Sequence, residues 1–306
     1  MDELVTLRDV PQPAQDSAMR LAPPLLALVA LACGAAVAQP RYPAWSEHVE
    51  LDVVSTLDRR AALVGELRVP ASDRERAPVV VIVNSSPGFD GRSARYAASL
   101  NDAGIASFEV DFFQGRGIAP WIVADMPHTF RALDWLARHP RIDGARAGIM
   151  GFSYGGQLAI LAASDEIVRT YARPGERYAA HLGVYPQCWQ LRRARAERDP
   201  RYKPTFFDAV TGRPVHVLVR DQDDYGSLVG CRAFLDALPA ASRRAFALTV
   251  YEGATFGWDH RHGGVSYEAT GNLGRGAMVR QTADPEVTAR SRAFAVSYFY
   301  RNLGAP

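Results

Sequence analysis

Ser153 stands between two glycines in the run Gly151-Phe152-Ser153-Tyr154-Gly155, a spacing typical of a nucleophile elbow. In an elbow a strand turns sharply into a helix, the serine takes strained backbone angles, and side chains at the glycine positions would clash. The apolar run 147–150 predicts the strand, and the small and apolar residues 156–163 predict a buried helix. An ordinary loop turn is the alternative. The chemistry of an elbow serine is acyl transfer.

Acyl transfer also needs donors for the oxyanion, a base, and an acid that orients the base, because a serine hydroxyl is a weak nucleophile at neutral pH. The backbone N–H of Tyr154 follows the nucleophile and is the first expected donor. The second is expected from the loop after the β-branched run 79–83. We assign it to the N–H of Ser86, because Pro87 has no N–H and Gly88 lies further from the strand end. A plain polar turn is the alternative.

Three aspartates compete for the role of the acid in the loop after the apolar run 215–219. Asp223 is the predicted acid by its distance from the strand end, and Asp221 is the second choice. Because acidic loop residues are usually solvated, this assignment depends on the serine.

The elements that must position these residues alternate between strands and helices. Residues 47–55 and 62–69 predict an antiparallel opening hairpin. Further strands are expected at 79–83, 105–110, 147–150, 181–185, 215–219 and 246–251, and helices at 93–103, 126–138, 156–163, 228–238 and 285–302. This pattern predicts an α/β fold, a mostly parallel central sheet with helices on both faces and ligands at the carboxyl ends of its strands.

Composition is that of a globular protein with one full core: 306 residues, 48% hydrophobic and 22% charged. The formal charge is +2, and Lys203 is the one lysine among 35 basic residues. Because the arginines are scattered without a basic stripe, we expect no nucleic-acid partner.

The N-terminus predicts export. Met19-Arg20 precedes the apolar run 21–33, and Ala36-Val37-Ala38 has the form of a signal-peptidase site. We expect a start at Met19, cleavage after Ala38, a single domain over 39–306, and a periplasmic or secreted protein without a membrane partner. An uncleaved anchor is an alternative, although the run is short for a membrane span. Lipidation of Cys33 is another.

Cleavage would leave two cysteines, Cys188 and Cys231, in an oxidising compartment. They are a candidate disulfide, with two buried thiols as the alternative. Neither has a metal-binding spacing.

The ordered motifs resemble the dienelactone hydrolase family of α/β-hydrolases over roughly residues 47–303. The matching segments are 81–88, 104–106 with 110–111, 114–117, 148–156, 185–188 and 251–254. The resemblance implies the α/β-hydrolase fold and a hydrolase of small carboxylic esters or lactones that uses no metal or other cofactor and forms an acyl-enzyme on Ser153.

Two catalytic positions depart from the family pattern. Dienelactone hydrolases have a cysteine nucleophile and a glutamate in the first oxyanion loop, where this chain has Ser153 and Ser85. This difference argues against dienelactone as the substrate and favours a serine esterase-like relative of the family. The family's histidine position, in a pattern resembling Tyr-Pro-Gly-Ala-x-His-x-Phe, is occupied by Phe256. Phenylalanine cannot accept a proton, and loss of a triad member costs serine hydrolases several orders of magnitude in rate.

His260 is the candidate for a displaced base, because it lies just downstream in a glycine-containing loop that also holds His262. The alternatives are two solvated histidines, or a His-x-His metal pair for which no third ligand has a suitable spacing. The other histidines precede the expected base in the chain and are predicted to be structural.

Phe256 also leaves two other interpretations of the function open. One is a catalytically impaired or non-catalytic binding protein on a hydrolase scaffold. The other is that Phe256 replaces a native histidine through engineering or a sequence error, in which case Phe256→His should raise esterase activity about a hundredfold.

Aromatic residues near strand ends are candidates for a substrate pocket, with core packing as the alternative; we single out Phe152, Trp258 and Trp121. The sequence leaves open the substrate, the oligomeric state and the way in which residues 260–284 cover the site.

Overall fold

The computed structural model describes residues 41–54, 60–112, 122–196, 203 and 205–304. They all belong to one compact unit, Pro40–Pro306. The predicted signal segment and Trp121 lie outside the described residues.

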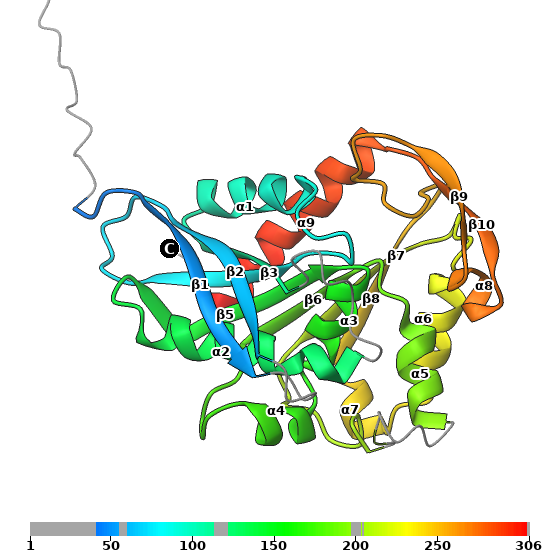
Figure 1. The fold of residues 1–306 in the computed structure, drawn as a ribbon, viewed down its shortest axis with the longest axis horizontal. Helices are drawn as coiled ribbons and strands as arrows, with labels where there is room; N and C mark the ends of the chain where they lie inside the picture. Colours follow the sequence, from blue (N-terminus) through cyan, green and yellow to red (C-terminus); the bar gives the residue numbers. More distant parts are fainter. Residues whose placement is uncertain (1–40, 55–59, 113–121, 197–202, 204, 305–306) are drawn as a thin grey trace, which may run out of the picture. The chain divides into compact units, whose positions relative to one another are not determined.

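Within the described part of the chain, eight strands form one sheet in the order β1-β2-β4-β3-β5-β6-β7-β8 (Figure 1). The two pairs β1–β2 and β2–β4 are antiparallel, and every other neighbouring pair is parallel. The opening hairpin and the mostly parallel sheet are therefore confirmed. The strands are β1 (Trp45–Val54), β2 (Arg60–Val69), β3 (Ala77–Val83), β4 (Ala106–Asp111), β5 (Ile142–Phe152), β6 (Ala180–Val184), β7 (Val215–Arg220) and β8 (Phe246–Tyr251).

Helices cover both faces of the sheet (Figure 1). The alternation of side chains along the strands explains why. Val79 and Val81 of β3 belong to the apolar cluster packed by α2 (Met126–Arg138), α3 (Tyr154–Leu161) and α6 (Ser227–Asp236). Val80 and Ile82 belong to the opposite cluster, packed by α1 (Arg92–Asp102) and α9 (Pro285–Leu303). A strand buried on both faces needs a continuous apolar run, and the β-branched run of β3 supplies one.

The remaining helices and strands lie in the connections between these elements, and the sequence pattern did not predict them. They are η1 (Ile122–Asp125), α4 (Asp165–Tyr171), α5 (Cys188–Ala196), α7 (Ala240–Arg243), β9 (Gly264–Glu268), α8 (Gly271–Gly274) and β10 (Ala277–Gln281). No helix of the described residues has both the length and the apolar character to cross a bilayer.

The connection between β8 and α9 contains an antiparallel hairpin, β9–β10. It is anchored on the loop after β7: Asn272 N donates to Asp224 O (2.8 Å), Leu273 N to Tyr225 O (3.1 Å), and Arg280 N to the Asp224 carboxylate (2.8 Å). The segment that the sequence left open is therefore held against the loop that carries the predicted acid.

We expect stability to fall in acid because of His181, which is fully buried on β6. Burial lowers the pKa of His181 to about 4, although its Nδ1 lies 3.0 Å from Ala159 O. In the unfolded chain this histidine has a pKa near 6.5, so the unfolded chain binds the proton first as the pH falls. Between pH 6.5 and pH 4 the free energy of unfolding should therefore decrease by on the order of 3 kcal/mol. Urea unfolding of His181→Leu across this window should give a shallower pH dependence than the parent. The exposed His48→Leu is the matched control, and parallel slopes for parent and His181→Leu would contradict the prediction.

Candidate active site

Ser153 has the strained conformation that the motif predicts, with φ 51° and ψ −110° at the junction of β5 and α3. The flanking glycines are required by close backbone contacts. A Cβ on Gly151 would lie 2.3 Å from the carbonyl carbon of Gly155, and one on Gly155 would lie 2.4 Å from Val83 O. Such a backbone conformation costs about 1–3 kcal/mol and is typical of functional sites.

The predicted oxyanion donors border the elbow. Tyr154 is the first residue of α3, where N–H groups have no acceptor within the helix. The loop after β3 is brought to the elbow by the contact of Gly155 with Val83 and Asn84. Its turn is closed by Gly88 N, which donates to Ser85 O (2.8 Å), and Ser86 lies exposed at the corner. Ser86 as the second donor stays a prediction.

The Ser153 hydroxyl has no base hydrogen-bonded to it in the described part of the chain. Ser153 is 8% exposed, and its Oγ makes no hydrogen bond to any residue that the structure describes. Among the described residues, the predicted nucleophile is therefore not hydrogen-bonded to a proton acceptor.

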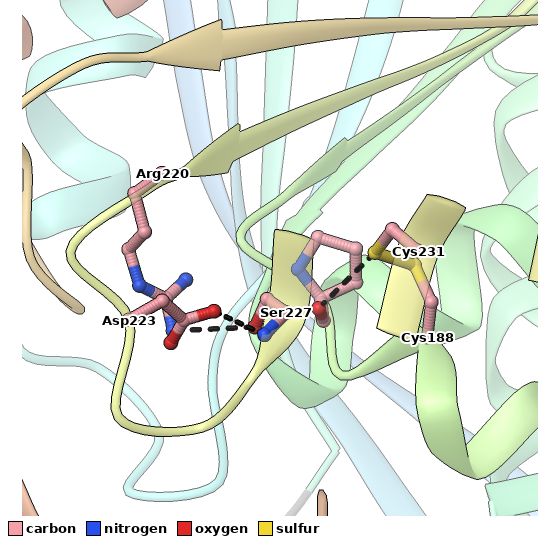
Figure 2. The surroundings of a disulfide bond; sticks show 6 residues. Cys188, Arg220, Asp223, Ser227 and Cys231 are labelled. Carbon is pink, nitrogen blue, oxygen red and sulfur yellow. Dashed lines mark hydrogen bonds and ion pairs between the residues drawn. A yellow bond between two sulfur atoms is a disulfide. The ribbon is translucent and has the colours of Figure 1, made fainter. Parts of the chain in front are cut away.

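Asp223 is buried between β7 and α6, as expected of an acid, but its partner is a guanidinium (Figure 2). Its carboxylate accepts from Arg220 Nη2 at 2.5 Å, from Tyr225 N at 3.0 Å, and from Ser227 N. The side chains of Asp223 and Arg220 are 2% and 0% exposed. The second choice, Asp221, is exposed and accepts from Gly253 N at 2.7 Å. The geometry thus favours Asp223 as the buried acid, without a histidine.

Arg220 is enclosed by aromatic rings. Its Cζ lies 4.8 Å from the ring centroid of Phe256, 5.7 Å from that of Tyr185 and 6.0 Å from that of Tyr225. Nη2 also donates to Ser227 Oγ at 3.2 Å, whereas Nε and Nη1 are buried and have no hydrogen-bond partner among the described residues. Burial lowers the pKa of Arg220. Arg220 is not marked by any motif in the sequence, and the available signal was a charged side chain at the end of an apolar strand.

Phe256 packs as an apolar side chain in the loop after β8. It is 8% exposed, and its ring centroid lies 4.6 Å from that of Tyr225 and 5.2 Å from that of Tyr185. The base position predicted from the family resemblance is therefore filled by a ring that contacts the partner of Asp223.

His260 lies next to Phe256, at a ring-centroid distance of 6.1 Å. Its Nε2 is buried and has no hydrogen-bond partner in the part of the chain that the structure describes. Burial, and then the positive charge of Arg92, lower the pKa of His260 to about 4, so the imidazole is neutral at pH 7. A neutral ring can accept a proton, but the structure has no hydrogen bond from His260 to Ser153 or to Asp223.

A second polar network, also missed by sequence reasoning, joins the first oxyanion loop to β6. Tyr185 follows β6 with φ 39°, and its hydroxyl donates to Asp259 Oδ1 at 2.7 Å and accepts from Arg92 Nη1 at 2.7 Å. Arg92 Nη2 also donates to Ser85 Oγ. Burial raises the pKa of Asp259, which also accepts from Tyr96. The network fixes Tyr185, one wall of the aromatic enclosure around Arg220.

Cys188 and Cys231 form a disulfide, with an S–S distance of 2.04 Å (Figure 2). Cys188 is the first residue of α5, shortly after Tyr185, and Cys231 lies on α6, one turn after Ser227. The disulfide therefore links the segment that carries Tyr185 to the helix whose N-terminus binds Asp223.

The aromatic residues predicted to line a pocket pack in the interior where they are described. Phe152 is fully buried and contacts Tyr96 and Tyr185, with ring centroids 5.0 Å and 6.1 Å away. Trp258 is also fully buried, and its Nε1 donates to Ser291 Oγ at 3.2 Å. This is the core packing that the sequence left as the alternative. Within the described residues, no group of three or more His, Cys, Asp or Glu side chains is placed to hold a metal ion.

No protein-family model matches this chain, and the comparison with curated proteins finds no match. Solved structures do match its fold. A dienelactone hydrolase from Anabaena variabilis has a TM-score of 0.53 at 16% identity, covering 84% of this chain and 98% of its own. Thermogutta terrifontis esterase 2, phosphoramylated by tabun, has a TM-score of 0.57 at 14% identity, covering 84% and 95%. Est1E from Butyrivibrio proteoclasticus has a TM-score of 0.51 at 15% identity, covering 81% and 98%.

Proposed function

The chain has the α/β-hydrolase fold, and from this premise we propose that the protein is an exported serine hydrolase similar to dienelactone hydrolases. It acts on small carboxylic esters or lactones through an acyl-enzyme on Ser153, without a cofactor. The observation that carries the proposal is the strained backbone of Ser153, a conformation that serves nucleophilic attack. A disulfide near the site suits an oxidising compartment, which supports export.

In the proposed reaction Ser153 Oγ attacks the substrate carbonyl, and the N–H groups of Tyr154 and Ser86 hold the oxyanion. The serine proton passes to a base and then to the leaving alcohol, after which water hydrolyses the acyl-enzyme. His260 is the proposed base, and it must move to reach Ser153. A base with a pKa near 4 is weak at pH 7, so we expect slow turnover. The Asp223 carboxylate is paired with Arg220, and its role of orienting the base stays a prediction.

The second candidate is a binding protein on the same scaffold. The ion pair between Asp223 and Arg220, packed against Phe256, favours it, because the acid and the base position are both used for other contacts.

Two measurements separate the candidates. A fluorophosphonate probe should label Ser153 in the parent, with the adduct located by mass spectrometry, and Ser153→Ala should remain unlabelled. In a small-ester assay Ser153→Ala should hydrolyse the ester about tenfold or more slowly than the parent. This loss of rate is smaller than in an enzyme with a complete triad, because effects within a triad are not additive. Ser297→Ala on α9 is the matched control and should behave as the parent. An unlabelled parent with an ester rate equal to that of Ser153→Ala would contradict the hydrolase and favour the binding protein.

A further inference from the structure

Arg220 is a buried cation in the place where a serine hydrolase brings its acid and its base together. It ends β7, is fully buried, and forms a 2.5 Å ion pair with Asp223. Triads of this fold follow the chain order serine, acid, histidine, so the base is expected in the loop after β8. That loop supplies Phe256, whose ring faces the guanidinium at 4.8 Å.

We infer that Arg220 and Phe256 form a coupled replacement of the catalytic histidine, in which Arg220 takes Asp223 as its partner and a base at position 256 can act only after Arg220 is removed. The inference deepens the proposed hydrolase function and rests on it. It assigns Arg220 as the positioning residue that decides whether the acid is available.

The Asp223 carboxylate already has hydrogen-bond donors and a counter-charge, and none of them is a histidine. The Asp223 carboxylate accepts from Arg220, Tyr225 N and Ser227 N, which occupies most of its lone-pair sites. Because Arg220 neutralises its charge at close range, Asp223 gives little additional stabilisation to an imidazolium.

The aromatic enclosure matches the needs of the guanidinium. The rings of Phe256, Tyr185 and Tyr225 surround Arg220, and two of its nitrogens have no hydrogen-bond partner within the described residues. Aromatic faces attract a desolvated guanidinium through their quadrupoles. Phe256 therefore stabilises the buried guanidinium of Arg220. A histidine there would face a positive charge, which disfavours protonation of the ring.

The test compares ester hydrolysis by the parent, Phe256→His, Arg220→Met and the double variant Phe256→His/Arg220→Met. We expect no gain in either single variant and a gain of about a hundredfold or more over the parent in the double variant, the scale of general-base catalysis. The gain should follow the titration of an imidazole in kcat/KM and disappear when Ser153→Ala is added. Phe256→His/Arg220→Lys is the matched control: it keeps the cation and should show no gain.

A second readout does not depend on ester turnover, so it separates failure of this inference from failure of the proposed function. In Phe256→His alone, NMR titration should give the introduced histidine a pKa below the ordinary 6.5, since it faces Arg220. A pKa above 6.5 would mean that it pairs with Asp223, and the inference would be wrong. A hundredfold gain in Phe256→His alone, an equal gain with Arg220→Lys, or no gain in a folded double variant whose Ser153 still reacts with fluorophosphonate would also overturn it.

Discussion

Asp223→Ala is expected to lower the free energy of unfolding by about 3–5 kcal/mol, because it leaves the guanidinium of Arg220 buried without its counter-charge. Arg220 is fully buried, and Asp223 is its one carboxylate partner among the described residues. The substitution also removes the acceptor of two backbone N–H groups, those of Tyr225 and Ser227. The aromatic rings around Arg220 attract the cation but do not neutralise it.

Urea unfolding followed by circular dichroism measures this loss. The matched control is Asp221→Ala in the same loop, which removes an exposed carboxylate bonded to Gly253 N and should cost only about 1 kcal/mol. The double variant Arg220→Met/Asp223→Asn should recover most of the loss, because it removes both buried charges and keeps an acceptor for the backbone. If Asp223→Ala unfolds within 1 kcal/mol of the Asp221→Ala control, the ion pair does not have the proposed importance.

Loss of the disulfide is the second large effect. Cys188 and Cys231 are 43 residues apart. Without the disulfide the unfolded chain gains conformational entropy, which for a loop of this length lowers the free energy of unfolding by about 4 kcal/mol. The double variant Cys188→Ala/Cys231→Ala should therefore unfold at a much lower urea concentration than the parent. Because Ser227 and Cys231 lie one turn apart on α6, the contact of Ser227 N with Asp223 should also loosen.

A reductant provides the control for the disulfide. It should destabilise the parent to nearly the level of the double alanine variant and leave that variant unchanged. A parent whose unfolding is insensitive to complete reduction, verified by thiol titration, is the result that would contradict this prediction.

These two effects concern one structural unit. The β7 to α6 loop carries Asp223, the disulfide secures α6 behind it, and β9–β10 is hydrogen-bonded to its outer side through Asp224. On the other side, Tyr185 connects Arg220 to the network of Arg92 and Asp259. Asp223, the acid that a triad would use, is thus engaged in holding this end of the sheet together.

The fold was predictable because its signals are local. The β-branched run of β3, the alternation in the opening hairpin and the helical patterns of α2 and α9 each depend on residues close together in the chain. The same holds for the elbow. The steric limits at Gly151 and Gly155 arise within one strand-to-helix turn, so the motif was sufficient to place Ser153 in its strained conformation.

The site was predictable only in part. The position of Asp223 follows from the end of a strand, but its partner does not, because Arg220 looks like the last residue of an apolar run. The core positions of Phe152 and Trp258 likewise depend on Tyr96, Tyr185 and Ser291, which come from distant segments.

The sequence by itself therefore determined the mostly parallel α/β fold, the elbow and the absence of histidine at position 256. Only the tertiary structure decided what Phe256 and Asp223 do instead. The physical reason is that backbone sterics and side-chain periodicity act between near neighbours in the chain. The enclosure of Arg220 by Tyr185, Tyr225 and Phe256 requires the ends of β6, β7 and β8 to meet in space, and no local pattern records which side chains face one another there.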